Sequence, residues 1–80
     1  MSRPLLTLYG RPGCHLCEDM LAVLEDLRGE LGFSIEVRDV DADPAWRARY
    51  GLRVPVLAAG DEEICHFFLD PQKLRAWLSR

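Results

Sequence analysis

Two cysteines of this 80-residue chain are spaced so that they could form and break a disulfide bond. Cys14 and Cys17 are separated by two residues and follow the turn-forming run Gly10-Arg11-Pro12-Gly13. A helical pattern begins directly after them, so we expect Cys14 at a helix N-terminus. Unpaired backbone amides and the helix dipole stabilise a thiolate at such a position. One helical turn along, Cys17 lies within reach of the Cys14 sulfur.

This arrangement predicts thiol–disulfide exchange. A Cys14 thiolate attacks a substrate disulfide to form a mixed disulfide, and Cys17 then resolves it by forming the Cys14–Cys17 bond. Arg11 and His15 flank the motif, and we expect Arg53 to approach it, so that cationic groups surround the thiolate in an otherwise acidic chain. Cys14 and Cys17 are therefore the predicted catalytic residues.

The elements around the motif indicate a βαβ unit. The apolar run over residues 5–9 predicts a strand buried on both faces. A helix follows, which we expect to end at Gly29, and its apolar face is formed by Leu16, Met20, Val23, Leu24 and Leu27. Alternation over residues 33–38 predicts a second strand that runs parallel to the first. Its more buried face is made of Phe33, Ile35 and Val37.

The second half of the chain reads as helix, strand, strand, helix. Asp43-Pro44 and Asp70-Pro71 each predict a helix start, in which Asp caps and Pro occupies the first turn. Residues 54–59 and 63–68 predict an antiparallel hairpin joined through residues 60–62. We therefore expect an α/β fold in the order βαβ(α)ββα, with a four-stranded mixed sheet flanked by helices, as a single domain over residues 1–80.

Composition excludes several other classes of protein. The chain is 49% hydrophobic, which is too much for a disordered protein, and no run approaches the 18 apolar residues of a membrane-spanning helix. Ten basic and thirteen acidic residues give a net charge of −3, which argues against nucleic-acid binding. Three cysteines and the lack of a secretion signal argue against a structural disulfide framework. We expect a cytoplasmic monomer.

The chain resembles the glutaredoxins of the thioredoxin-fold superfamily, and in particular the small bacterial glutaredoxin-like proteins. The resemblance rests on Leu8-Tyr9-Gly10-Arg11-Pro12-Gly13-Cys14-His15-Leu16-Cys17, on Val54-Pro55 and on the element order. It implies that Cys14 is the exposed nucleophile and Cys17 the buried resolving thiol. It also implies that Pro55 is a cis-proline facing the disulfide, that the Val54 backbone pairs with a substrate or glutathione cysteine, and that Arg11 contacts glutathione.

Three positions depart from the glutaredoxin pattern. His15-Leu16 stands between the cysteines where Pro-Tyr is usual, and Arg53 stands where a Thr commonly precedes the cis-proline. Cys65-His66 occupies the place of the Gly-Gly pair that helps to hold glutathione. Disulfide exchange is therefore better supported than glutathione specificity. We expect protein or low-molecular-weight disulfides as substrates, with glutathione as a candidate co-substrate and no required cofactor.

Two alternatives belong to other functional classes. Cys14, Cys17 and Cys65, with His15 or His66, would supply ligands for zinc or for an iron–sulfur centre. We favour a structural Cys65 over this metal site, because the chain lacks a second close ligand pair. In the other alternative, the fold serves as an interaction module and its cysteines are incidental.

One basic cluster also has two interpretations. Arg47, Arg49 and Arg53 follow one another closely before the Val54-Pro55 step. They form either a solvated face or a rim that attracts an anionic thiol substrate to the site.

Overall fold

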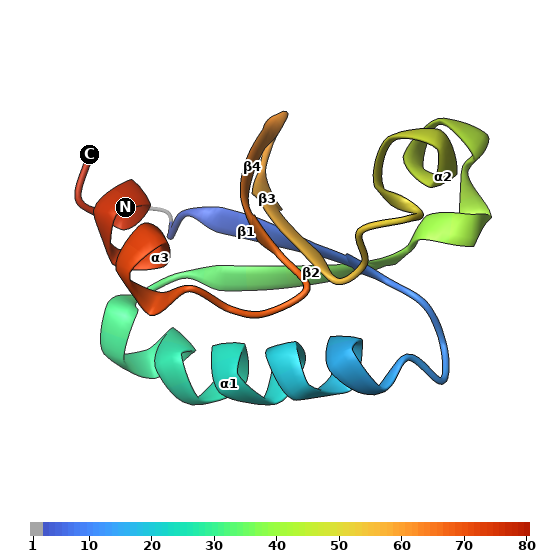
Figure 1. Cartoon of the computed structure of the whole chain (residues 1–80). Helices are drawn as coiled ribbons and strands as arrows, with labels where there is room; N and C mark the ends of the chain where they lie inside the picture. The colour runs from blue at the N-terminus through green and yellow to red at the C-terminus, as the bar shows by residue number, and fades with distance from the viewer. Residues whose placement is uncertain (1–2) are drawn as a thin grey trace.

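The computed structural model describes residues 3–80. In order, these residues form β1 (Leu5–Gly10), α1 (His15–Leu31), β2 (Ser34–Asp39), the 3₁₀ turn η1 (Val40–Ala42), α2 (Pro44–Tyr50), β3 (Val56–Ala59), β4 (Glu62–His66) and α3 (Pro71–Leu78). The strands form one mixed sheet in the order β2-β1-β3-β4 (Figure 1). The predicted α/β fold with a four-stranded mixed sheet flanked by helices is confirmed.

The strand register brings two loops to one end of the sheet. β1 runs parallel to β2, from Leu5 opposite Ser34 to Gly10 opposite Asp39. β1 runs antiparallel to β3, with Tyr9 opposite Val56. The segment before β3, which contains Val54 and Pro55, therefore lies beside the carboxyl end of β1, from which the chain leads to Cys14.

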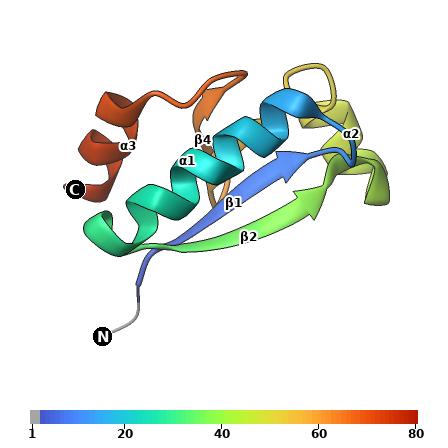
Figure 2. The same cartoon turned by 90° about the horizontal axis from the view of Figure 1, so that it is seen from below.

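Apolar side chains cover both faces of the sheet, as strand alternation requires. On one face, Leu6, Leu8 and Leu57 pack with residues of α1 and α3, including Leu24 and Leu74. On the other face, the cluster is made of Tyr9, Val40, Tyr50, Val56 and Ala58. α1 and α3 thus lie on one side and α2 on the other, and the view from below shows α1 in front of the sheet, running alongside β1 (Figure 2).

Both predicted aspartate caps are present. The Asp43 carboxylate accepts a hydrogen bond from Ala45 N at 2.8 Å, and the Asp70 carboxylate accepts from the amides of Gln72 and Lys73. Each cap satisfies amides that have no partner within the helix, and the proline that follows has no amide hydrogen to satisfy. Among residues 3–80, no helix is long and apolar enough to cross a membrane.

The structure corrects the predicted end of α1 and its apolar face. The helix runs past Gly29 to Leu31 and ends at Gly32, which adopts the left-handed conformation at φ 74° and donates its amide to Arg28 O. Leu16 and Val23 are exposed, although their spacing places them with the core residues. The reason is that α1 meets the sheet along a narrow stripe, on which Met20 and Leu24 are buried.

The two predicted strands at the sheet edges are also corrected. Val37 is 58% exposed rather than on a buried face, because β2 is an edge strand and a cleft lies between its carboxyl end and α1. Phe33 is fully buried but precedes β2. β4 ends at His66, because Phe67 takes a left-handed backbone (φ 64°) and turns the chain out of the ladder, so Phe68 lies outside the strand.

Candidate functional site

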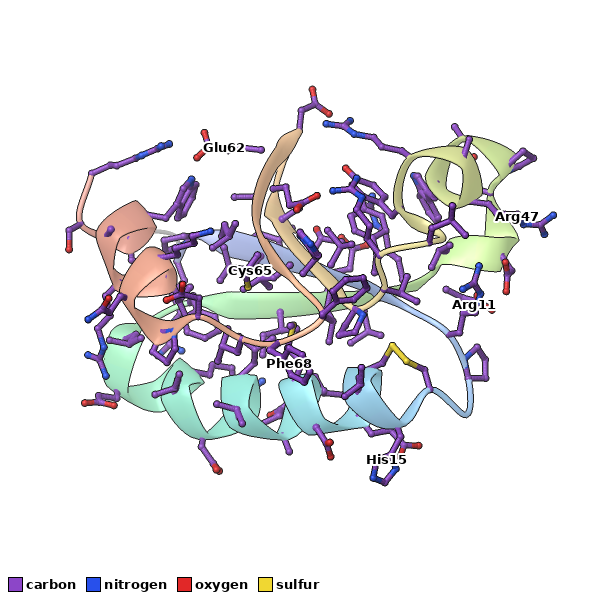
Figure 3. All side chains as sticks on the ribbon, in the orientation of Figure 1. Arg11, His15, Arg47, Glu62, Cys65 and Phe68 are labelled. Carbon is purple, nitrogen blue, oxygen red and sulfur yellow. A yellow bond between two sulfur atoms is a disulfide. The ribbon has the colours of Figure 1, made fainter. Side chains whose placement is uncertain are left out.

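Cys14 and Cys17 are joined by a disulfide at the start of α1 (Figure 3). Their Cα atoms are 5.2 Å apart. Cys14 is the N-cap residue, and its sulfur accepts a hydrogen bond from Cys17 N at 3.2 Å. Cys14 is half-buried, whereas Cys17 is only 7% exposed and lies in the first turn of the helix. The cysteine that caps the helix is therefore the more accessible of the two.

Two glycines shape the loop that carries the pair. Gly13 has φ 75°, a left-handed conformation that a side chain would strain, and it turns the chain directly before Cys14. Gly10 ends β1 against the disulfide, since a Cβ atom there would lie 3.0 Å from Cys17 Sγ and 3.2 Å from Cys17 Cβ. Gly10 therefore makes room for the buried sulfur.

The Val54–Pro55 segment enters β3 beside this loop. The peptide bond between the two residues is cis. Val54 is half-buried and Pro55 is almost fully buried, while the Pro55 carbonyl accepts a hydrogen bond from Phe67 N at 2.9 Å. The segment is thereby connected to the turn that follows β4.

Arg11 is engaged with groups other than the sulfurs. Its guanidinium donates to the Asp41 carboxylate at 3.0 Å and to Gly51 O at 2.8 Å. The hydrogen bond from Arg11 is the main cause of a pKa of Asp41 below its usual value, and Arg47 contributes to the same effect. Arg11 thus fastens the loop before Cys14 to the start and the end of the α2 region.

Arg53 and His15 occupy different surroundings from those of Arg11. Arg53 forms an ion pair with Glu63 and donates to Arg49 O, and Glu63 also contacts His66 Nδ1 at 2.8 Å. His15 is exposed on the side of α1 that is turned away from the sheet (Figure 3). The cationic groups expected around Cys14 are therefore paired with carboxylates or directed elsewhere, so the helix N-terminus is the main electropositive feature at the sulfur.

Cys65 belongs to the core. It is buried among the residues that pack α1 and α3 on the sheet, and burial raises the pKa of its thiol. Among residues 3–80, no three His, Cys, Asp or Glu side chains are grouped in a way that could hold a metal ion. The Cys14, Cys17 and Cys65 ligand set of the alternative interpretation is not brought together.

Comparison with known proteins identifies the family. A model of the glutaredoxin-like domain (DUF836) matches residues 5–79. The chain belongs to this family. It is 36% identical to an uncharacterized protein of Mycobacterium tuberculosis over 85 aligned residues, which cover 100% of this chain and 88% of the relative. The fold and the paired cysteines of this family member fit a redox role.

Solved structures support the same assignment. Protein Ne2328 from Nitrosomonas europaea is 40% identical with a TM-score of 0.86, covering 96% of this chain and 93% of its own. Protein XcR50 from X. campestris is 39% identical with a TM-score of 0.71, covering 92% and 95%. Thioredoxin 1 from Thermosipho africanus is 20% identical with a TM-score of 0.63, covering 94% of both chains, and so shares the fold.

Sequence reasoning missed several features of the site. The contact between Gly10 and Cys17 and the carboxylate partners of Arg11 and Arg53 depend on long-range packing. A groove beside Leu16 was also missed, although the adjacent phenylalanines Phe67 and Phe68 are a signal that could have drawn attention to it.

Proposed function

We propose that this glutaredoxin-like protein is a thiol–disulfide oxidoreductase that acts through a Cys14–Cys17 dithiol/disulfide couple. The observation that carries the proposal is the disulfide at the N-terminus of α1, with the more accessible sulfur at the capping position. If the two cysteines had no redox role, nothing would favour Cys14 being more exposed than Cys17. Cys14 acts as the nucleophile and Cys17 as the resolving residue.

The proposed cycle has two exchanges. The Cys14 thiolate attacks one sulfur of a substrate disulfide, forms a mixed disulfide and releases the other substrate sulfur as a thiolate. The Cys17 thiolate then attacks Cys14 Sγ, forms the Cys14–Cys17 bond and releases the second substrate thiolate. Two electrons pass from the dithiol to the substrate, and the two thiol protons end on the product thiols. An external thiol reductant restores the dithiol.

The surroundings of the sulfurs suit these two roles. The Cys17 amide that donates to Cys14 Sγ stabilises negative charge on that sulfur, together with the dipole of the 17-residue helix. Burial of Cys17 in the first helical turn keeps it from external disulfides but leaves it next to Cys14. Proximity makes the second exchange intramolecular, which shortens the life of the mixed disulfide.

The Val54–Pro55 segment is the proposed site for the substrate backbone. It lies beside the carboxyl end of β1, and Val54 is accessible enough to pair with an extended substrate segment. Glutathione is a candidate co-substrate. Arg11 already donates to Asp41 and Gly51, so it would contact glutathione through its remaining N–H groups.

Single cysteine variants test the proposal. Reduced protein is mixed with a small aromatic disulfide, and thiol release is followed by absorbance while adducts are identified by mass spectrometry. Wild type should release two thiols and end as the internal disulfide, whereas Cys17→Ser should stop at a mixed disulfide on Cys14. Cys14→Ser should release neither thiol at a comparable rate, and undiminished release by this variant contradicts the assigned nucleophile.

Cys65→Ser is the matched control, because it removes the one thiol that lies outside the pair. It should retain the wild-type rate. Repeating the assay with oxidised glutathione tests the co-substrate separately. A glutathione adduct on Cys14 of the Cys17→Ser variant supports glutathione use, and its absence alongside a normal reaction with the aromatic disulfide restricts the activity to other disulfides.

A further inference from the structure

An apolar groove lies between α1 and the segment that follows β4. Its lining includes Leu16, Asp19, Met20 and Val23 of α1 together with Phe67 and Phe68, and we refer to it as the Phe68 groove. Figure 3 shows Phe68 on the segment after β4, next to α1 and on the same side of the sheet as the disulfide. Leu16, which lines the groove, stands between Cys14 and Cys17 in the chain, so one end of the groove lies at the helical turn that carries the two cysteines.

Four of the apolar side chains that line the groove are exposed rather than packed. Phe68 is 68% exposed, and Leu16, Val23 and Phe67 are each more than one-third exposed. Isolated apolar residues are common on protein surfaces, but four that line one groove indicate a contact surface. Burial of this surface against a partner would be favourable.

The backbone holds the two phenylalanines in this position. Phe67 has φ 64°, a conformation that is costly for a bulky residue. Its amide donates to Pro55 O at 2.9 Å, and the Phe68 amide donates to His66 O at 2.7 Å. Such local strain is characteristic of binding sites. The hydrogen bond to Pro55 links the Phe68 groove directly to the segment that we propose for the substrate backbone.

The size and charge of the groove indicate its occupant. Its volume of about 250 Å³ is below the roughly 300–1,000 Å³ of small-molecule sites, so it suits a side chain or two of a larger partner. Asp19 is the charged residue in the lining, and no arginine or lysine is among the lining residues from the described part of the chain. An anionic tripeptide such as glutathione is therefore poorly matched.

The basic cluster does not change this charge balance. Arg47 pairs with Asp41, Arg49 with Asp61, and Arg53 with Glu63. These cations are partly neutralised, and none of them lines the Phe68 groove. The second interpretation of the cluster, attraction of an anionic substrate, gains no support here.

We infer that the Phe68 groove docks the polypeptide that flanks a substrate cystine. It takes an apolar side chain next to the reacting cysteine and places a basic side chain near Asp19. The inference rests on the proposed function and narrows its substrate class to protein disulfides with apolar and basic neighbours. Phe67 and Phe68 are then specificity-determining residues.

Symmetric disulfides of short peptides test this inference. The peptides contain Lys-Leu-Cys, Lys-Ser-Cys or Glu-Leu-Cys, and the rate at which each oxidises the reduced protein is measured by quenching and mass spectrometry. Wild type should prefer Leu to Ser by on the order of fivefold, as expected for partial burial of one aliphatic side chain. Phe68→Ser should remove this preference, and Asp19→Asn should reduce the preference for Lys over Glu.

Leu5→Ser is the matched control, since Leu5 is also an exposed apolar residue but begins β1 at the end opposite to the disulfide. It should keep the wild-type preference. If Phe68→Ser keeps it as well, or if wild type shows no preference, the docking inference is overturned.

A binding experiment separates this failure from that of the proposed function. A Lys-Leu-Ser peptide, which has no sulfur to exchange, is titrated into the oxidised protein while amide NMR shifts are recorded. Shifts at Val23, Phe67 and Phe68 without any disulfide reduction by the reduced protein support docking and refute the oxidoreductase. Reduction of all peptides at equal rates without such shifts supports the oxidoreductase and refutes docking.

Discussion

Gly10→Ala tests how closely β1 packs on the disulfide. An alanine Cβ at this position would lie 3.0 Å from Cys17 Sγ and 3.2 Å from Cys17 Cβ. Both distances are below ordinary van der Waals contact, so one side must move by a few tenths of an ångström. Neither side moves freely, because Gly10 is paired with Asp39 in the sheet and Cys17 is bonded to Cys14.

Overpacking of this kind costs about 1–3 kcal/mol of folding free energy. In a domain of this size, each kcal/mol lowers the melting temperature by roughly 4–8 °C. The assay is thermal unfolding of the oxidised protein, followed by circular dichroism. Gly29→Ala is the matched control, because Gly29 lies inside α1 and a Cβ atom there would point into open space, with nothing packed within 4 Å of it. This control should stabilise the protein by about 0.5–1 kcal/mol through helix propensity.

The two glycine substitutions therefore have opposite expected signs. A Cys17→Ser background adds a second comparison, because an oxygen is smaller than a sulfur and the Gly10→Ala penalty should decrease there. If Gly10→Ala melts at or above the wild-type temperature, Gly10 is not needed for space at the disulfide. A penalty that is unchanged by Cys17→Ser would assign the cost to the strand rather than to the sulfur.

Two further predictions follow from the charges and burial of individual side chains. Because the pKa of Asp41 is lowered in the folded state, its pairing with Arg11 stabilises the protein above the unfolded pKa of about 3.9 and is lost as the pH falls through the folded value. The urea midpoints of wild type and Asp41→Asn should therefore differ at pH 6 and converge as the pH falls below the unfolded value; a constant difference would refute the linkage. Burial raises the pKa of Cys65, so in the reduced native protein iodoacetamide should label Cys14 well before Cys65, and unfolding in urea should abolish that order. Mass spectrometry of timed samples checks this, and equal labelling of Cys14 and Cys65 in the native protein would contradict the buried position.

Local patterns in the sequence were sufficient for most of the fold. Asp43-Pro44 and Asp70-Pro71 predicted two helix starts correctly, because a cap and its proline act within a few residues. The end of α1 was predicted three residues too early. Gly29 and Gly32 are both plausible stops in sequence, and the choice between them depends on where the chain must turn to reach β2.

Cys14 and Cys17 lie at the start of a helix, as the sequence predicts, but the partners of the nearby cationic groups differ from the prediction. The spacing of Cys14 and Cys17 by itself brings the two sulfurs within bonding reach on one helical turn. The cationic surroundings were predicted from adjacency in the chain, but the guanidinium of Arg11 pairs with Asp41, which is 30 residues away. A sequence pattern carries no information about such a competition among distant charges.

Short-range periodicity, caps and turns are enough to predict the cysteine pair, the βαβ unit that carries it and the order of the remaining elements. Tertiary packing leaves Leu16 and Val23 exposed and brings Phe67 and Phe68 beside them in one groove. The physical reason is that exposure depends on which surfaces the packed elements leave uncovered. That outcome is set by the geometry of the whole sheet and its helices, not by the hydrophobicity of any one segment.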